Sequence, residues 1–538
     1  MFKILNRESK TIIGAATIVG VLSFVSRIVG LIRDRILAGQ FGAGDTLDIY
    51  YAAFKIPDLL FTLIVVGALS ASFIPLFLSH YSRASRRKKA WDFTNNTLHL
   101  VAGTMVLLSI CLILFADPLA QIVAPGFAQY KQVKVAQLMR IMFSAQVLLS
   151  ISMIYGSVLQ SLKRFLLYAL APIFYNFGII IGALYFVEPF GTTGLAWGVV
   201  LGASLHLLTQ VMGVRQTDYR FQFRPRPFDK DALTMLKLMG PRTLGLAVNQ
   251  VLFVILTIIA STLAIGSVTI FQFAYNIQFF AVGIIGVSFA IAVFPSLSEA
   301  IESGEKEKFV ELFISTTRQV LYLMIPMMLL FLILRAQIVR VVVGAGAFDW
   351  AATISTADTL AFFALTFIPQ ALIFLLARAF YALHDTVTPL MTGAVSALVG
   401  LLAAFALRDS FGVTALAMAY SLAALINVTL MWVILRQRMG SLAESQLLVT
   451  IYKLSAAGLV ATVVMQILKP VAISIISLDT FIGVLTQGLF AGGLGLLAYV
   501  GVCSLLKVKD QKLMTDTLKR KVLRRIRPEE ALDSLDSI

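Results

Sequence analysis

Long apolar runs, separated by short polar segments, recur along the whole chain. About 20 helical residues cross the roughly 30 Å hydrocarbon core of a bilayer. The pattern therefore predicts an all-α polytopic membrane protein with about 14 transmembrane helices. The predicted spans are residues 12–37, 48–78, 93–116, 136–160, 166–187, 193–213, 238–264, 268–297, 319–336, 357–382, 387–407, 413–435, 447–468 and 481–505.

The lysines and arginines between these spans are unevenly distributed. If the N-terminus is cytoplasmic, the inner segments hold 30 of them, whereas the outer segments and adjoining helix ends hold 6. Cytoplasmic loops of membrane proteins carry this excess. Both termini are therefore predicted to be cytoplasmic, with residues 506–538 as a basic cytoplasmic tail.

Short sequence patterns recur when 221 is added to their residue numbers. "AAFKIP" (52–57) corresponds to "FAYNIQ" (273–278), and "LQSLKRF" (159–165) corresponds to "FYALHDT" (380–386). The shared offset predicts two pseudo-symmetric lobes of six helices each. Because six is even, both lobes enter the membrane from the same side, so the repeats are parallel.

The repeat also predicts a division of the chain. The N-lobe is residues 1–213, the cytoplasmic inter-lobe linker is 214–237 and the C-lobe is 238–435. Residues 447–505, which hold the last two spans, have no counterpart. Transporters built from such repeats bind substrate between the lobes and alternate access by rocking.

Composition narrows the functional classes. The 538 residues are 59% hydrophobic and 13% charged, and the mean hydropathy is +0.89. The formal charge of +16 sits in clusters between the spans, which is typical of topology signals and does not indicate a nucleic-acid partner. The chain has no ATPase loop, no hydrolase motif and no metal-ligand spacing. We therefore predict a transporter, not an enzyme, with no cofactor and no bound metal.

Several charged residues lie inside the spans, where each costs at least roughly 2.5 kcal/mol on insertion scales. The first span contains Arg27 and Arg33, and the second contains Asp48 and Lys55 seven residues apart on one helix face. Arg378 lies deep in the tenth span. Such residues usually face a cavity, and guanidinium groups bind phosphate through two parallel hydrogen bonds. A cationic cavity of this kind predicts an anionic substrate.

Structural explanations for the same residues stay open. Arg33, Asp34 and Arg35 would serve equally as anchors at the outer end of the first span. Arg27 and Lys55 would also be explained by local pairing within the helix bundle, and Arg378 by pairing or by function.

At this point the sequence resembles a known family. "SRIVGLIRDRILAGQFGAGDTLDIYYAAFKIPDLL" (26–60), followed by "GALSASFIPLF" (67–77), is similar to the N-terminal signature of the MurJ (MviN) lipid II flippases. "FPSLSEAIESGEKEKF" (294–309) and "FYALHDTVTPL" (380–390) resemble two further family stretches. The resemblance runs, with gaps, from about residue 12 to about residue 440. The family belongs to the multidrug/oligosaccharidyl-lipid/polysaccharide exporter superfamily.

The resemblance implies an inverted V of two lobes around a central cationic cavity. It implies a groove in residues 447–505 for the polyprenyl tail, and functional roles for Arg27, Arg33 and Asp48. The implied substrate is an undecaprenyl-diphosphate-linked sugar–peptide lipid in the bacterial cytoplasmic (inner) membrane. Cell-wall synthesis proteins are candidate partners.

The chain departs from its proteobacterial relatives at several charged positions. Those relatives carry paired arginines where this chain has Phe61 and Thr62, and an acidic residue where it has Val66. An Asp-Arg pair is replaced by Tyr275 and Asn276, and we keep Asn276 as a candidate substrate-binding residue. Some members bind sodium through Asn and Asp in the eleventh span. Residues 387–407 contain neither, so no sodium site is expected.

The leading hypothesis is outward flipping of lipid II. A flippase for another lipid-linked oligosaccharide is the nearest alternative, because the lost charges leave the headgroup open. A cation-coupled exporter of small molecules would need a membrane carboxylate, for which Asp48 is the main candidate. A non-transporting membrane scaffold is the fourth alternative.

Overall fold

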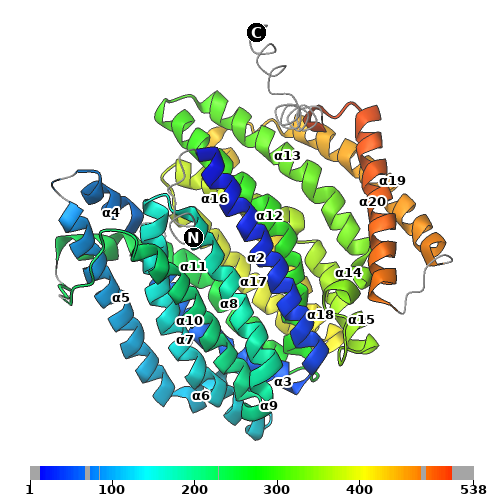
Figure 1. Cartoon of the computed structure of the whole chain (residues 1–538). Coiled ribbons are helices and arrows are strands. Elements are labelled where there is room, and N and C mark those ends of the chain that lie inside the picture. Colours follow the sequence, from blue (N-terminus) through cyan, green and yellow to red (C-terminus); the bar gives the residue numbers. More distant parts are fainter. Residues whose placement is uncertain are drawn as a thin grey trace, which may run out of the picture. The chain divides into compact units, whose positions relative to one another are not determined.

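The computed structural model describes residues 12–66, 73–83, 85, 87–223, 225–227, 229–473 and 480–511. Within these ranges every regular element is helical and no strand occurs (Figure 1). The predicted all-α class is therefore confirmed. Residues 1–11 and 512–538, which include most of the predicted basic tail, lie outside the described residues.

Eleven helices in the described ranges are long and apolar enough to cross a membrane. A twelfth span is obtained if α15 (Trp350–Ala364) and α16 (Phe367–Ala382) form one broken span. Two more helices, α2 (Ile12–Phe41) and α11 (Lys230–Ser261), contain 30 and 32 residues. These numbers are consistent with the 14 predicted spans.

The helices differ from the predicted spans mainly at their ends. α13 (Lys306–Ile333) begins well before residue 319, where the predicted span starts, and α11 begins inside the predicted linker. A hydropathy pattern marks the part of a helix that crosses the lipid, whereas the helix itself continues for as long as its backbone hydrogen bonds are formed. The predicted span 357–382 is interrupted at residues 365 and 366. Pro369 lies in the first turn of α16, where its missing N–H costs nothing and favours a new helix start.

The chain folds into two packed units. The first unit comprises Met1–Ile277, Val342–Thr359 and Thr386–Ala423. Its helices are α2, α3 (Asp45–Phe61) with the π-helical turn η1 (Thr62–Val66), α4 (Ile74–Tyr81), α5 (Arg87–Leu114), α6 (Ala116–Val123), α7 (Gln129–Ser161), α8 (Phe165–Ile181) with η4 (Gly182–Phe186), α9 (Val187–Phe190), α10 (Thr193–Val214), α11, the start of α12 (Ser267–Glu302), most of α15, α17 (Val387–Phe411) and the start of α18 (Thr414–Met439).

The second unit comprises Gln278–Val341, Leu360–Asp385 and Ala424–Ile538. It contains the remainder of α12, α13, nearly all of α14 (Arg335–Val342), α16, the end of α18, α19 (Glu444–Ile473) and α20 (Phe481–Leu505). Phe309 and Phe313 of α13 pack with Phe380 of α16 in one buried cluster. α19 and α20 pack on α13, where the Tyr499 hydroxyl donates to the Tyr322 carbonyl at 2.9 Å. The lobe, linker and groove boundaries given above stay predictions.

One backbone turn occurs twice at the predicted repeat offset. Lys163, after α7, has a left-handed φ of 57°, and His384, at the matching position of the second repeat, has a φ of 58°. The N–H of Arg164 bonds to the carbonyl of Leu159, and the N–H of Asp385 bonds to that of Phe380, so the bonded residues match at the same offset. This matched turn, a Schellman-type helix end, supports the internal repeat.

Small residues bring α8 and α10 into close contact. Gly178 and Gly182 face Gly202 and Gly198, so a Cβ added at Gly178 would lie 2.2 Å from the Cα of Gly202. This is the small-xxx-small packing by which membrane helices approach each other closely.

The segment between α10 and α11 is held against α5 by two buried asparagines. The side-chain oxygen of Asn95 accepts from the Tyr219 hydroxyl at 2.6 Å and from the Gln222 N–H at 3.2 Å. Asn96 accepts from the N–H of Arg226 at 2.7 Å and donates to its carbonyl at 3.0 Å. The described part of this segment is therefore fixed to α5 by hydrogen bonds from its backbone and from one tyrosine hydroxyl.

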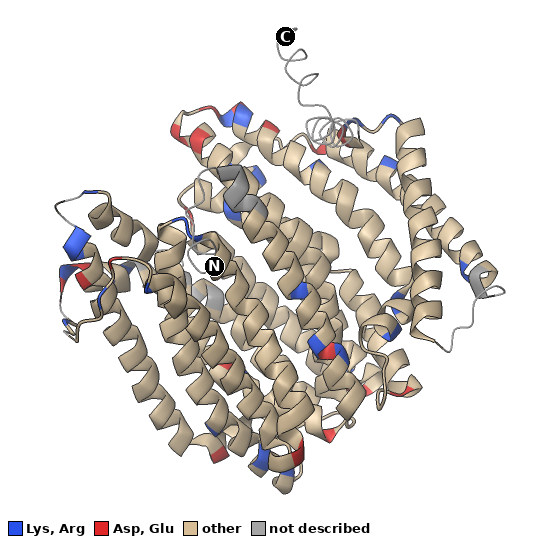
Figure 2. Cartoon of the chain, in the orientation of Figure 1, with Lys and Arg blue, Asp and Glu red and all other residues tan. Residues whose placement is uncertain are grey.

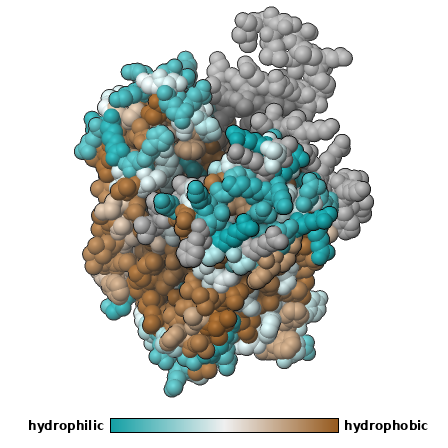
Figure 3. Space-filling model, turned by 90° about the vertical axis from the view of Figure 1, so that its left-hand side faces the viewer, coloured by the Kyte–Doolittle hydropathy of each residue, from teal (hydrophilic) through white to brown (hydrophobic). Residues whose placement is uncertain are grey.

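Apolar side chains are exposed along the helices, and charges gather at the helix ends. Figure 2 shows most lysines, arginines and acidic residues near helix ends, with only a few in the middle of helices. On the face in Figure 3 a broad apolar region lies between hydrophilic ends. Leu107 on α5 and Leu402 on α17 are each 62% exposed. Soluble proteins rarely expose large apolar areas, so these surfaces are lipid-facing.

Candidate functional site

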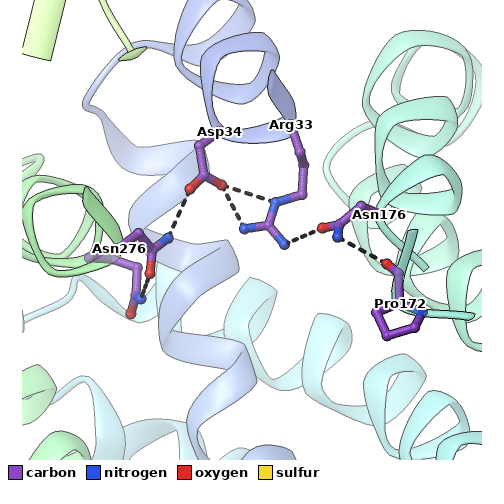
Figure 4. Close-up of polar contacts among 6 residues, drawn as sticks. Arg33, Asp34, Pro172, Asn176 and Asn276 are labelled. Atoms are coloured by element: carbon purple, nitrogen blue, oxygen red, sulfur yellow. Dashed lines mark hydrogen bonds and ion pairs between the residues drawn. The ribbon is translucent and has the colours of Figure 1, made fainter. Parts of the chain in front are cut away.

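The second half of α2 places a charged pair inside the first unit. Arg33 donates from Nε at 3.0 Å and from Nη2 at 2.7 Å to the same oxygen of Asp34. Its Nη1 donates to the side-chain oxygen of Asn176 on α8 at 3.0 Å, and Asn176 itself donates to the Pro172 carbonyl (Figure 4). The Asp34 side chain is 3% exposed and that of Arg33 is 22% exposed. The guanidinium is therefore held in a fixed plane from two helices.

The same pair connects to α12 and α3 through neutral amides. Asn276 donates to the second oxygen of Asp34 at 2.9 Å, and Gln272 donates to Asn276 at 2.8 Å. Lys55 on α3 donates from Nζ to Gln272 at 2.8 Å. We call the six residues Asn176, Arg33, Asp34, Asn276, Gln272 and Lys55 the polar chain. It joins four helices of the first unit through successive side-chain hydrogen bonds.

A second carboxylate lies one helical turn after Lys55. Asp58 accepts a hydrogen bond at 2.9 Å from Nε2 of Gln146 on α7. Lys55 and Asp58 are three residues apart on α3 and therefore share a helix face, with their charges attracting each other. Within the described residues no lysine or arginine nitrogen comes within 4 Å of Asp58.

The charges of the polar chain and Asp58 balance each other. The polar chain contains two cations and one carboxylate, and Asp58 adds a second carboxylate beside Lys55. The two carboxylates therefore offset part of the positive charge of the predicted cationic cavity. The buried position of Asp34 also shows that it is part of this arrangement and is not only an anchor at the end of α2.

Asp48 has a different environment from the one expected. Its carboxylate accepts from the backbone N–H groups of Gly266 at 2.7 Å and Thr269 at 2.9 Å, and from the Thr269 hydroxyl at 2.7 Å. Asp48 therefore caps the N-terminus of α12, where an acceptor satisfies free N–H groups and a negative charge opposes the helix dipole. Within the described residues, no lysine or arginine nitrogen lies within 4 Å of this carboxylate.

The other two candidates, Arg27 and Arg378, are not among the six residues of the polar chain. Arg27 is half-buried, six residues before Arg33 on α2. Arg378 belongs to the second unit, where its guanidinium lies 5.3 Å from the ring centre of Phe294 and 5.9 Å from that of Tyr381. Of the six predicted residues, the structure links Arg33, Lys55 and Asn276 in one chain of hydrogen bonds.

Sequence reasoning missed the neutral and acidic partners of these cations. Gln272, Asn176 and Gln146 are uncharged amide residues within largely apolar helices, and Asp58 follows Lys55 by three residues. An uncharged amide inside a span is a weak signal, because many such residues only bond to their own helix. Asp58 could have been found from its spacing to Lys55.

Comparison with curated proteins gives relatives that cover most of the chain. A probable lipid II flippase MurJ of Buchnera aphidicola subsp. Baizongia pistaciae (strain Bp) is 29% identical over 458 residues, covering 84% of this chain and 89% of the relative. One from Buchnera aphidicola subsp. Acyrthosiphon pisum (strain APS) is 28% identical, covering 91% and 96%. One from Rhizobium tropici is 29% identical, covering 78% and 80%.

Solved structures share the fold. A lipid II flippase MurJ in an inward closed conformation matches with a TM-score of 0.74 and 22% identity, covering 91% of this chain and 98% of that one. An inward-facing multidrug resistance transporter of the MATE family and MOP superfamily matches with a TM-score of 0.67 and 12% identity, covering 79% and 99%. A family model described as lipid II flippase MurJ matches residues 37–486, which is most of the sequence. This chain therefore belongs to the lipid II flippase MurJ family.

Proposed function

We propose that this chain is a flippase that carries lipid II, an undecaprenyl-diphosphate-linked peptidoglycan precursor, from the inner to the outer leaflet of the bacterial cytoplasmic membrane. The observation that supports this most strongly is the family match over residues 37–486. The protein is a transporter and not a catalyst, and it works by alternating access. Both termini face the cytoplasm in this proposal.

The polar chain supports recognition of a diphosphate. Three of the five N–H groups of Arg33 bond to Asp34 and Asn176, so each terminal nitrogen keeps one N–H for an anion. A guanidinium with N–H groups left on both terminal nitrogens suits phosphate oxygens. Lys55 adds a second positive charge, and Asn276 adds an amide that is already oriented by Gln272. Arg27 adds charge one to two turns earlier on α2.

Balanced charge has a consequence for substrate binding. Asp34 and Asp58 lower the attraction that Arg33 and Lys55 exert on an anion, so the site does not hold the diphosphate too tightly to release it. The same carboxylates allow the cations to remain inside a membrane, where an unpaired charge is costly. The polyprenyl tail stays in lipid, next to a groove that we assign to α19 and α20.

The test is complementation of a bacterium depleted of its own MurJ. The wild-type chain should restore growth and lipid II translocation, whereas an Arg33→Ala variant that accumulates to the same level should not. Failure of the well-expressed wild-type chain would contradict lipid II as the cargo. Lipid II and an undecaprenyl-diphosphate lipid with an unrelated glycan should then be compared for binding, because Phe61, Thr62 and Tyr275 replace charges of the relatives. Tighter binding of the lipid with the unrelated glycan would favour a flippase for another lipid-linked oligosaccharide.

A further inference from the structure

A polar cavity lies in the first unit away from the polar chain. Its volume is about 320 Å³, and it forms where the end of α4, the start of α5, the α7–α8 turn and the segment after α10 meet. Its lining includes three cations, Arg87, Lys163 and Arg164, and one carboxylate, Asp218. The cavity therefore carries an excess of positive charge.

The two arginines are held by groups that leave their charge unneutralised. Arg164 donates from Nη1 to the carbonyl of Gln216 at 3.0 Å. The guanidinium of Arg87 lies 5.1 Å from the ring centre of Tyr81, a cation–π contact. Among the described residues, no carboxylate oxygen lies within 4 Å of the charged nitrogens of Arg87, Lys163 or Arg164. The two arginine side chains are thus oriented, and the charges of all three cations remain open to an anion.

The second copy of the α7–α8 turn shows that the fold does not require this charge. His384 and Asp385 occupy the positions of Lys163 and Arg164 with the same backbone geometry. There Asp385 forms an ion pair of 2.6 Å with Arg438, so the local charge is neutralised. The basic pair Lys163–Arg164 is therefore a property of this cavity and not of the turn.

We propose that this cavity binds the phosphate group of an anionic phospholipid headgroup of the inner leaflet. The cavity lies where membrane-length helices end, which is the depth of lipid phosphates. Basic pockets at the cytoplasmic ends of transmembrane helices bind such headgroups, and a guanidinium fits phosphate oxygens well. The phosphate chemistry follows from the cavity itself, and the assignment to the inner leaflet rests on the orientation proposed above.

The test compares two double variants of the full-length protein in detergent. Arg87→Gln with Lys163→Gln removes two charges from the cavity, whereas Arg83→Gln with Lys88→Gln removes two exposed charges nearby that do not line it. Binding of short-chain phosphatidylglycerol, phosphatidylcholine and inorganic phosphate is measured by calorimetry. We expect the cavity variant to bind phosphatidylglycerol about tenfold or more weakly, and the control to change by less than about twofold. Phosphatidylcholine should bind weakly to all three proteins.

Equal affinities of the cavity variant and the wild type would overturn the proposal, as would equal losses in both variants. Inorganic phosphate that binds as tightly as phosphatidylglycerol, and only to the intact cavity, would assign the site to a soluble phosphate and overturn the lipid. If the double variant does not fold, Lys163→His replaces it, because the second copy of the turn carries histidine at this position. At pH 8, where an exposed histidine is neutral, it should lose phosphatidylglycerol affinity in the same direction.

Discussion

At the scale of single residues, the ion pair between Arg33 and Asp34 determines how the guanidinium is presented to an anion. Asp34 takes two of the five N–H groups, and Asn176 takes a third. The plane of the guanidinium is therefore fixed before any substrate arrives. The Arg33 side chain therefore loses less conformational entropy when a substrate binds.

Replacing Arg33 by lysine should separate charge from geometry. A lysine keeps the positive charge but cannot bond to Asp34, Asn176 and a phosphate in one plane. We expect Arg33→Lys to weaken binding of an undecaprenyl-diphosphate lipid about tenfold or more, since a hydrogen bond to a charged group is worth roughly 1.5–3 kcal/mol. Equilibrium binding to purified protein measures this, with the thermal unfolding temperature as a check on folding. Full affinity in Arg33→Lys would show that charge alone is sufficient, and full affinity in Arg33→Ala would remove Arg33 from the site.

Asp48 should contribute to stability through α12. Asp48→Ala removes three acceptor bonds at a helix N-terminus, and a lost cap typically costs about 0.5–2 kcal/mol. We expect a lower unfolding temperature for Asp48→Ala and a smaller decrease for Asp48→Asn, which keeps one acceptor oxygen. Asp45→Asn is the matched control, because Asp45 lies one turn earlier, is 37% exposed and bonds to Lys131 and Tyr130. An unfolding temperature of Asp48→Ala equal to that of the control would contradict the capping role.

The candidate residues could be found from sequence because a charge inside a membrane span is rare and costly. Their partners could not be found in this way. Lys55 and Gln272 are 217 residues apart, and Arg33 and Asn176 are 143 apart, so no local pattern pairs them. The capping contacts of Asp48 could not be predicted for a related reason, since its partners are mostly backbone N–H groups, which almost any residue supplies.

At the scale of helices, the α8–α10 contact depends on the absence of side chains. A Cβ at Gly178 would lie 2.2 Å from the backbone of Gly202, so the helices would have to separate. We expect Gly178→Ala to destabilise the protein by about 1–3 kcal/mol, the usual cost of overpacking. Gly103→Ala on α5 is the control, because nothing lies within 4 Å of the added carbon, and a helix favours alanine. Thermal unfolding in detergent measures the stability of both variants. Equal unfolding temperatures would contradict the proposed role of this contact.

α17 should not make transport dependent on sodium. Its inner polar residues use their hydroxyls within the helix, with Thr392 donating to Thr388 at 3.0 Å and Ser396 to Thr392 at 2.6 Å. Residues 387–407 contain no Asp or Asn, and hard cations need several oxygen ligands. We expect equal transport in sodium and in potassium buffer at matched membrane potential. A large loss confined to the sodium-free condition would contradict this expectation.

The all-helical class was predictable because an apolar run of about 20 residues has few alternatives in lipid. Helix ends were less predictable. α13 begins in the charged segment at Lys306, which a hydropathy scale excludes although its residues favour a helix. The break before α16 was missed because its main local signal is one proline near the start of the new helix, within a run that has the length of a single span.

At the scale of the whole molecule, the orientation follows from the distribution of lysine and arginine. We expect residues 79–92 on the cytoplasmic side and residues 118–133 on the outer side. Single cysteines in place of the exposed residues Ser85 and Gln129, in a variant without Cys111 and Cys503, should react differently with an impermeant thiol reagent. In intact cells only the cysteine at position 129 should be labelled. Labelling at position 85 in intact cells would reverse the proposed orientation.

The contact between Asp48 and Thr269 has a consequence for the symmetry of the repeats. The two residues are 221 positions apart, so each occupies the place of the other in its own repeat. If the two repeats were identical, the same residue would lie on both sides of this contact. Two aspartates would repel each other, and two threonines would lack the charged acceptor. The contact therefore requires one repeat to supply the acid and the other the donor. At this position the two repeats must therefore differ in sequence. A chain with the same residue in both repeats here would lose the hydrogen bond between Asp48 and Thr269.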